Sequence, residues 1–148
     1  MAEFYISMTS KEISTQIADM INKYNRWSRI FSADEIMSAS AKYFIEVERS
    51  RVVGCASFIV EHPTLSKIQH VCVLPEYRRL GLGRKLVTIT INHCDTDYIY
   101  MSIREDNEPS IRLAESLGFV YVRRDWVIDH WTRILGRRTK NATPTITT

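Results

Sequence analysis

Helical spacing of apolar residues dominates the first forty positions of the chain. The capping box Thr9-x-x-Glu12 precedes apolar residues that share one helical face, which predicts a helix reaching about Asn25. A second capping box, Ser32-x-x-Glu35, predicts a shorter helix after an intervening loop. Ahead of both helices, residues 4–7 are expected to form a short strand.

From Lys42 onwards the pattern becomes that of strands. Residues 43–47 and 52–60 are rich in β-branched and aromatic side chains and are separated by a polar run, which is typical of a hairpin. A third strand over residues 68–74 is expected to end at Pro75, because proline removes a donor from the strand ladder. Three strands in series therefore follow the two helices.

The second half of the sequence alternates helices with strands. A helix is expected from Gly83 to about Cys94, followed by a strand over residues 98–103. Asn107 suits the N-cap of the next helix, and Gly118 suits its C-terminal stop. The helical connection predicts that the strands before and after it are parallel.

Two final strands, over residues 119–122 and 126–135, complete the expected sheet. Residues 123–125 are assigned to neither strand. Within the last strand Trp126 and Trp131 occupy even and odd positions, so they are expected on opposite faces.

Length and composition indicate one globular domain. The chain has 148 residues, of which 45% are hydrophobic and 25% are charged. We expect an α+β domain over residues 1–136, followed by a basic and then Thr-rich mobile tail over residues 137–148. The three cysteines form no Cys-x-x-Cys pair, and no segment has the roughly 18 apolar residues of a membrane span. These features predict a reducing, cytoplasmic compartment and no membrane contact.

The net charge of +3 is unevenly distributed along the sequence. Residues 1–70 hold 8 basic and 8 acidic side chains, whereas residues 71–148 hold 12 basic and 9 acidic ones. The second half therefore carries the whole excess, and a polyanionic ligand is expected there.

The stretch from Val71 to Leu86 carries the most specific chemistry in the sequence. It joins a strand to a helix N-terminus, and Gly81 and Gly83 let its backbone N–H groups approach an anion. Leu86 stands where the dinucleotide fingerprint requires a third glycine, and no Gly-Lys-Ser/Thr triplet exists for a nucleotide P-loop. The loop therefore predicts a phosphate or pyrophosphate site of another kind.

These residues resemble the GNAT superfamily of acyl-CoA-dependent N-acyltransferases. Arg78-x-x-Gly81-x-Gly83 is similar to the Arg/Gln-x-x-Gly-x-Gly/Ala loop of that family, and the strand end Val73-x-Pro75 leads into it in the same way. The segment from Asn107 to Phe119 resembles the asparagine, helix and Gly-Phe segment that follows the family's fifth strand. Both matches occur in the family's order and separation.

The resemblance implies a mixed, mostly antiparallel sheet whose fourth and fifth strands, here residues 68–74 and 98–103, splay apart between helices on both faces. Acetyl-CoA, the acyl donor, would lie in the gap, with its pantetheine arm along the first of these strands and its pyrophosphate on the loop. No metal is expected. The residues implied to bind the cofactor are Val71, Val73, Arg78, Arg79, Leu80, Gly81, Leu82, Gly83, Arg84, Asn107 and Ser110.

The resemblance also implies direct attack of a substrate amine on the acetyl thioester within a ternary complex. Two positions depart from the family pattern. Ala114 replaces a tyrosine that protonates the leaving thiolate, and Ser102 replaces a glutamate of the fifth strand. Ser110 is a candidate acid, with Tyr98, Tyr100 or water as alternatives.

His70 is the candidate base, because it lies on the strand beside the expected thioester and its pKa suits the task. Strict alternation places it with Ile68 and Cys72 on the core face, and a bulge would reverse that expectation. A metal pair or nucleophilic dyad with Cys72 stays open as an alternative. The remaining histidines, expected in loops or at the surface, are His62, His93 and His130.

The main expectation is an N-acetyltransferase that acts on a primary amine of a small molecule or protein. Tyr24, Arg26 and Trp27 belong to the loop that borders the substrate in the family. One alternative is an acyltransferase that acts on nucleic acid or aminoacyl-tRNA through the basic C-terminal part. The other is a catalytically weak CoA-binding interaction module.

Overall fold

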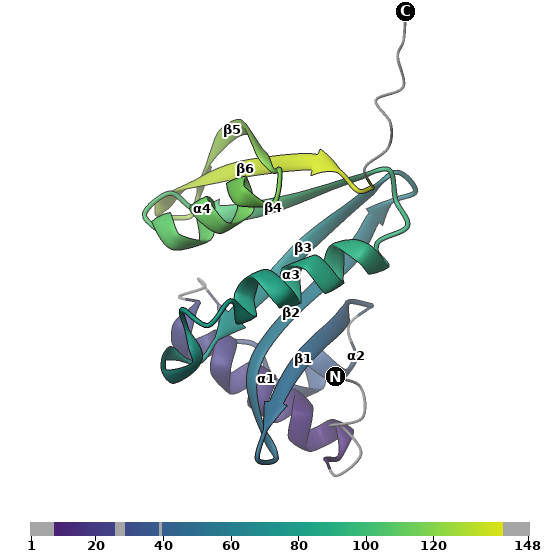
Figure 1. Ribbon diagram of the computed structural model, residues 1–148, viewed down its shortest axis with the longest axis vertical. Helices are drawn as coiled ribbons and strands as arrows, with labels where there is room; N and C mark the ends of the chain where they lie inside the picture. Colours follow the sequence, from purple (N-terminus) through teal and green to yellow (C-terminus); the bar gives the residue numbers. More distant parts are fainter. Residues whose placement is uncertain (1–7, 26–28, 39, 141–148) are drawn as a thin grey trace, which may run out of the picture.

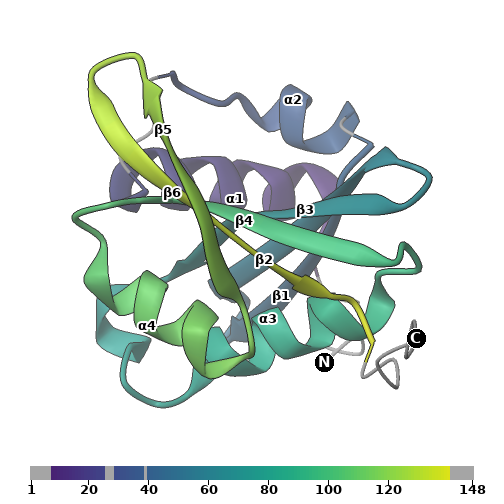
Figure 2. The same cartoon turned by 90° about the horizontal axis from the view of Figure 1, so that it is seen from above.

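A mixed sheet with helices on both faces organises the chain. The computed structural model describes residues 8–25, 29–38 and 40–140. Helices α1 (Ser10–Tyr24) and α2 (Ala33–Ser38) cover one face, and α3 (Leu82–His93) and α4 (Glu108–Ser116) cover the other (Figure 2). The sheet order is β1-β2-β3-β4-β6-β5. Its strands are β1 (Lys42–Glu48), β2 (Arg51–His62), β3 (Leu65–Val73), β4 (Tyr98–Arg104), β5 (Val120–Val127) and β6 (His130–Arg138).

The helices begin where the sequence predicts. The Thr9 side chain accepts a hydrogen bond from the Glu12 N–H, and the Glu12 carboxylate accepts one from the Thr9 N–H, which completes the first capping box. Ser32 and Glu35 form the second box in the same way. The expected α+β class is confirmed, whereas the strand predicted over residues 4–7 lies outside the described residues.

The strands β3 and β4 are the one parallel pair of the described sheet, and they splay apart. Their register runs from Leu65 opposite Tyr98 to Ile68 opposite Met101 and then stops. Beyond this point the two strands diverge (Figure 1). The predicted gap between the fourth and fifth family strands is thus present.

Two separate hydrophobic clusters stabilise the two faces of this sheet. One lies under α1 and α2 and includes Ile21 and Val53, both fully buried. The other lies under α3 and α4 and includes Val87 and Phe119. Each such side chain contributes about 1.5–3 kcal/mol through burial. The second cluster joins Ile68 of β3 to Ile99 of β4, so it also holds the two diverging strands together where they are still paired.

The C-terminal hairpin differs from the prediction. Residues 123–125, which were expected between two strands, belong to β5, and the turn lies at residues 128–129, inside the strand expected over residues 126–135. Because β5 is an edge strand that is exposed on both faces, polar side chains are tolerated within it, and they do not indicate a turn. Trp126 therefore pairs directly with Trp131, and their rings touch edge to face at 5.2 Å. The expectation that these rings lie on opposite faces was wrong.

The sheet also continues past the expected domain boundary at residue 136. Arg138 pairs with Tyr98 in the ladder, and the buried Thr139 donates its N–H to the Asp97 carbonyl at 2.9 Å. Residues 137–139 are therefore part of the fold rather than of a tail, and residues 141–148 lie outside the described part. None of the described helices has the length and hydrophobicity to cross a membrane.

Candidate active site

The divergence of β3 from β4 opens a cavity at the centre of the molecule. It has a volume of about 230 Å³. Past Ile68 the edge of β3 that faces β4 has no strand partner within the described sheet. The Asn25 side chain caps one group of this edge, the Val71 carbonyl, at 3.2 Å. The residues of β3 that line the cavity are Lys67, Ile68, Gln69, His70 and Val71.

A β-bulge sets the direction of the β3 side chains at the cavity. Cys55 and Ser57 of β2 are two residues apart, but their partners Cys72 and Gln69 are three apart. The extra residue rotates the strand, so that Ile68 packs in the α3 and α4 cluster whereas Cys72 packs in the α1 and α2 cluster. Strict alternation, which placed both on one face, was wrong because of this bulge.

His70 lies in the bulge with a positive φ of 56°. Its Nδ1 is 2.6 Å from the Tyr43 hydroxyl oxygen, and the edge of its ring meets Phe31 at 4.7 Å between centroids. Burial lowers the pKa of His70 to about 4, with smaller contributions from the cations of Lys67 and Arg29. The imidazole is therefore neutral at pH 7 and is a weak base.

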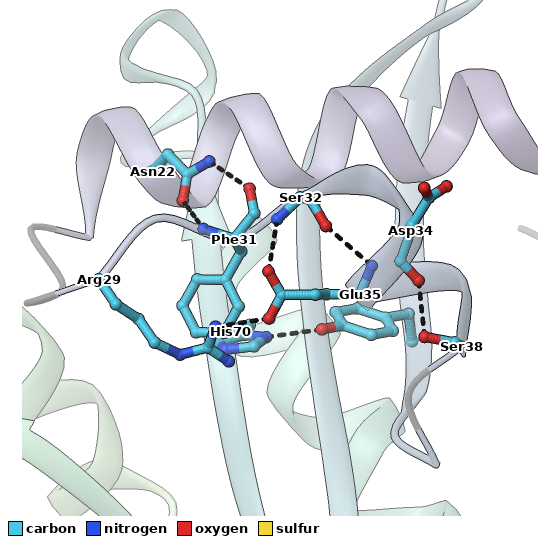
Figure 3. Close-up of polar contacts among 9 residues, drawn as sticks. Asn22, Arg29, Phe31, Ser32, Asp34, Glu35, Ser38 and His70 are labelled. Carbon is cyan, nitrogen blue, oxygen red and sulfur yellow. Dashed lines mark hydrogen bonds and ion pairs between the residues drawn. The ribbon is translucent and has the colours of Figure 1, made fainter.

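The loop after α1 holds Phe31 over His70 (Figure 3). Asn22 of α1 donates from Nδ2 to the Phe31 carbonyl and accepts from the Phe31 N–H at Oδ1, both at 2.8 Å. The Arg29 guanidinium lies over the Phe31 ring, 3.9 Å from its centroid, and pairs with Glu35. The Arg29 interaction lowers the pKa of Glu35. Arg26 and Trp27, expected at this wall, lie outside the described residues.

The loop between β3 and α3 has the geometry of an anion site. A short 3-10 turn over Pro75–Tyr77 leads to Gly81, whose φ of 78° lies in the left-handed region and which serves as N-cap of α3. The first intrahelical bond of α3 runs from the Lys85 N–H to the Gly81 carbonyl at 3.0 Å. The preceding N–H groups of the first turn are left for a ligand.

Gly83 lines this cradle without being required by the fold. A Cβ added there would meet its nearest neighbours, in Leu113 and Val73, at 3.5 and 3.9 Å, which are ordinary contact distances. The missing side chain therefore leaves room for a bound group. The residues and backbone present fit the pyrophosphate of acetyl-CoA.

The arginines of the loop are partly engaged within the chain. Arg78 Nε donates to the Val73 carbonyl at 2.8 Å, and Arg84 donates to the Ser116 hydroxyl at 2.6 Å. Their neighbour Leu80 is 74% exposed. The expected cofactor residues from Arg78 to Arg84 thus lie along one loop and the helix start that follows it, whereas Asn107 and Ser110 lie at the start of α4.

The two departures from the family pattern have different surroundings. Ala114 is buried in the core under α4, so it offers no polar atom to the cavity. Ser102 lines the cavity, as do Asn107 and Ser110 at the start of α4. The Asn107 side chain accepts the Ser110 N–H at 3.3 Å, which makes Asn107 the N-cap of this helix.

Several residues of the cavity were not predicted from the sequence, and three of them carry basic side chains. Lys67 and Arg104 line it, and so does His130, which was expected at the surface and is half-buried instead. Their positions follow from strand register and from the hairpin turn, which no local motif marks. No carboxylate occurs among the described residues that line the cavity.

Cys72 does not form a reactive pair with His70. Its thiol is directed at the Met20 carbonyl, and burial raises its pKa to about 12. The metal-pair alternative also lacks a third ligand, because no cluster of three His, Cys, Asp or Glu side chains occurs in the described part of the chain. Both alternatives are therefore left without a site.

A second hollow, a groove of about 710 Å³, continues from the cavity over β4, β6 and β5. Lys67 and Ser102 line both hollows, so the two are contiguous. The groove has aromatic and aliphatic walls at Tyr98, Tyr100 and Val122. The Tyr100 hydroxyl donates to the Glu61 carboxylate at 2.5 Å.

A split mixed sheet with a glycine loop at the gap defines an acyl-CoA-dependent N-acyltransferase. Residues 11–119 match the sequence profile of the acetyltransferase (GNAT) family. The chain belongs to this family and is a GNAT N-acetyltransferase. The resemblance read from the two motifs is thus confirmed.

Relatives agree with this assignment. An N-alpha-acetyltransferase of Sulfurisphaera tokodaii is 30% identical over 126 residues, which cover 71% of this chain and 75% of the relative. The ribosomal-protein-S18-alanine N-acetyltransferase of Escherichia coli has a TM-score of 0.76 at 18% identity, over 96% of this chain and 97% of that chain. The yncA protein of Salmonella typhimurium, solved with its cofactor acetyl-CoA, has a TM-score of 0.75 at 20% identity, over 88% and 90%. The two structures show a shared fold.

Proposed function

We propose that this protein transfers an acetyl group from acetyl-CoA to the α-amine at the N-terminus of a polypeptide. The observation that carries this proposal is the charge of the cavity, whose described lining includes Lys67 and Arg104 and no carboxylate. Such a lining disfavours an ammonium group and offers no strong base to deprotonate one.

The fraction of the acceptor amine that is neutral at pH 7 then distinguishes a lysine side chain from an α-amine. A lysine side chain with a pKa of about 10.4 is neutral in roughly one molecule in 10³ at pH 7, a deficit of about 4–5 kcal/mol. An α-amine with a pKa of about 8 carries a deficit of about 1.4 kcal/mol. His70, whose pKa is about 4, does not remove the larger deficit. The α-amine is therefore the acceptor that fits.

The groove beside the cavity supports a polypeptide rather than a small amine. It is contiguous with the cavity and offers Tyr98, Tyr100 and Val122 to the residues that follow the amine. The relative from Sulfurisphaera tokodaii is also named an N-alpha-acetyltransferase. This chain would act in the reducing, cytoplasmic compartment predicted from its cysteines, all three of which are buried free thiols.

Acetyl-CoA, when bound, supplies the activated acetyl thioester. In this proposal the first-turn N–H groups of α3 hold the pyrophosphate, and the pantetheine arm lies along the edge of β3 at Val71 and Val73, whose carbonyls accept from Asn25 and Arg78. Asn107 and Ser110 approach from the opposite side of the cavity, and the Ser110 hydroxyl is the candidate proton donor.

A nucleic-acid acceptor has less support than an amine of a polypeptide. Arg124 and Arg133 of the C-terminal hairpin both pair with Glu105, at 2.8 and 3.6 Å. Arg137 donates to the Leu117 carbonyl at 2.6 Å. These arginines are engaged within the chain, and their positive charge is partly compensated.

Calorimetric titration of acetyl-CoA into the wild type and Gly83→Glu tests the cofactor site. We expect micromolar binding by the wild type and none by the folded variant, because the new carboxylate fills and repels the cradle. Acetyl transfer is then compared between a lysine-free peptide with a free N-terminus and an N-terminally blocked peptide with one lysine. We expect the free α-amine to react about tenfold faster or more. A faster lysine peptide contradicts the acceptor, and binding without transfer to either peptide supports the CoA-binding module instead.

A further inference from the structure

The groove beside the cavity lies on the face of β4 that is turned away from α3 and α4. The odd-numbered residues of β4, namely Ile99, Met101 and Ile103, pack in the α3 and α4 cluster. The even-numbered residues therefore point to the opposite face of the sheet. On that face the α1 and α2 cluster includes no described residue of β4, β5 or β6, so this part of the sheet is left to line the groove.

Strand register arranges the groove in rows of side chains. Tyr98 of β4 lies opposite Arg138 of β6 in one row. Lys67, Tyr100 and Gly136 are paired across β3, β4 and β6 in the next row, two residues further along β4. The two rows are therefore about 7 Å apart, which is also the spacing of alternate side chains in an extended peptide. A polypeptide that lies along β4 can present one side chain to each row.

Gly136 leaves the floor of the groove open. A Cβ added there would meet the Ile99 carbonyl oxygen at 3.5 Å and the side chains of Val122 and Tyr100 at 3.7 and 3.9 Å, which are ordinary contact distances. The packing of the sheet therefore does not require a glycine at this position. The missing side chain gives the groove its depth between Tyr100 and Val122.

The two rows each contain one cation without a carboxylate partner among the described residues. Lys67 lies over the Tyr100 ring, 5.9 Å from its centroid, and Arg138 lies over the Tyr98 ring at 5.4 Å. Neither cation belongs to an ion pair within the described part of the chain. Aromatic rings hold the two side chains in place and leave their charge uncompensated.

The other charged groups of the groove are engaged with the rest of the chain. The Glu61 carboxylate accepts the Tyr100 hydroxyl at 2.5 Å, and Asp125 pairs with Arg123 at 3.0 Å. The Arg137 guanidinium donates to backbone carbonyls. The uncompensated charge of the groove is therefore positive and lies in the two rows.

We infer that the groove selects polypeptides with an acidic side chain directly after the N-terminal residue, and that Lys67 binds this carboxylate. The inference rests on the proposed function. Lys67 lines both the cavity and the groove, so its ammonium group lies where a polypeptide leaves the cavity. A carboxylate there accepts a charge-assisted hydrogen bond from Nζ, whereas an amide of the same shape forms no ion pair. Arg138, one row further along, favours a second acidic side chain two positions later.

Two lysine-free peptides that differ only in Asp or Asn at the second position test this selection. We expect kcat/KM for the wild type to be about fivefold higher with Asp, and this ratio should fall as the salt concentration rises. Lys67→Met should abolish the preference and Lys67→Glu should reverse it, with unchanged affinity for acetyl-CoA. Equal rates with the wild type overturn the inference and leave the proposed function standing. If the wild type acetylates no peptide with a free α-amine, the proposed function itself fails.

Lys42→Glu is the matched control for Lys67→Glu. It makes the same change of charge at an exposed lysine of β1 that lines neither hollow. The ratio between the Asp and Asn peptides should stay at its wild-type value. A ratio that changes equally in both variants shows an effect of net charge and contradicts the role of Lys67.

Gly136→Leu tests the groove itself by filling its floor. The folded variant should have about a tenfold higher KM for the Asp peptide, with unchanged affinity for acetyl-CoA. Analytical ultracentrifugation of both proteins distinguishes another occupant of the groove. A wild-type dimer that Gly136→Leu dissociates, with an unchanged peptide KM, would show that a second copy of the chain covers the groove and would overturn the inference.

Discussion

The two parts of the proposed site are made from different features of the polypeptide. The part proposed for the cofactor, which we call the cofactor wall, runs from Val73 through Gly83 and offers backbone N–H groups fixed by a turn and a helix start. The part proposed for the acceptor, which we call the acceptor wall, offers side chains, chiefly Phe31, Tyr43 and His70, which come from separate elements and meet through strand register. The difference shows that a backbone site is encoded locally, whereas a side-chain site is encoded by the whole fold.

The largest expected effect concerns the acceptor wall at acid pH. The pKa of His70 is lowered from 6.5 to about 4, so the unfolded chain binds its proton first as pH falls. As pH falls from 6.5 to 4, this side chain should therefore lower the free energy of unfolding by about 3 kcal/mol in total. The loss should reverse as pH rises again. The measurement is the free energy of unfolding by urea at several pH values.

The control for this prediction is His70→Phe, which fills the same space and does not titrate. The wild-type stability minus that of the variant should fall toward pH 4, whereas carboxylate titrations are common to both proteins and cancel. A difference that stays constant with pH would show that His70 is solvated, and the contrast between a buried acceptor wall and an exposed cofactor loop would be lost.

The second effect separates the two glycines of the cofactor wall. Gly83→Ala should raise stability by about 0.5–1 kcal/mol, because it adds a helix-favouring residue at ordinary contact distances. The same methyl occupies the cradle, so acetyl-CoA affinity should fall by about 10- to 100-fold. Thermal unfolding and calorimetry measure the two changes.

Gly81→Ala is the matched variant, since it adds the same methyl two residues earlier. Its Cβ meets nothing within 4 Å, but the backbone φ of 78° disfavours any side chain. Stability should fall by about 1 kcal/mol. Opposite signs of the stability change support a cradle shaped for a ligand at Gly83. Equal signs would indicate that both glycines serve the turn alone.

The same contrast explains how far the sequence predicts this protein. The capping boxes at Thr9 and Ser32 and the loop at Gly81 were located correctly, because each is made by residues close in sequence. The β3 bulge and the pairing of Trp126 with Trp131 were missed, because they depend on which residue of a neighbouring strand lies opposite. Strand alternation assumes a regular ladder, and the ladder is irregular at the cavity.

A third effect tests the support of the acceptor wall. Asn22→Ala removes both hydrogen bonds that hold the Phe31 backbone, which should lower stability by about 2 kcal/mol. It should also raise the KM for the acceptor, while the affinity for acetyl-CoA stays unchanged. Asn22→Asp keeps the acceptor oxygen for the Phe31 N–H and should give an intermediate loss. If the variant lowers the affinity for acetyl-CoA as much as it raises the KM for the acceptor, the two walls are coupled and the contrast between them is wrong.

The smallest effect separates wall position from stability. Ser32→Ala and Thr9→Ala each remove an N-cap from a capping box, so each should cost about 1 kcal/mol of stability. Ser32 directly follows Phe31, whereas Thr9 lies at the start of α1 before the first helical turn. Ser32→Ala should therefore raise the acceptor KM by about twofold and Thr9→Ala should not, although both lower the melting temperature alike. If both variants change KM equally, global stability rather than local geometry controls the acceptor wall, because the two caps share the same chemistry and differ in their distance from Phe31.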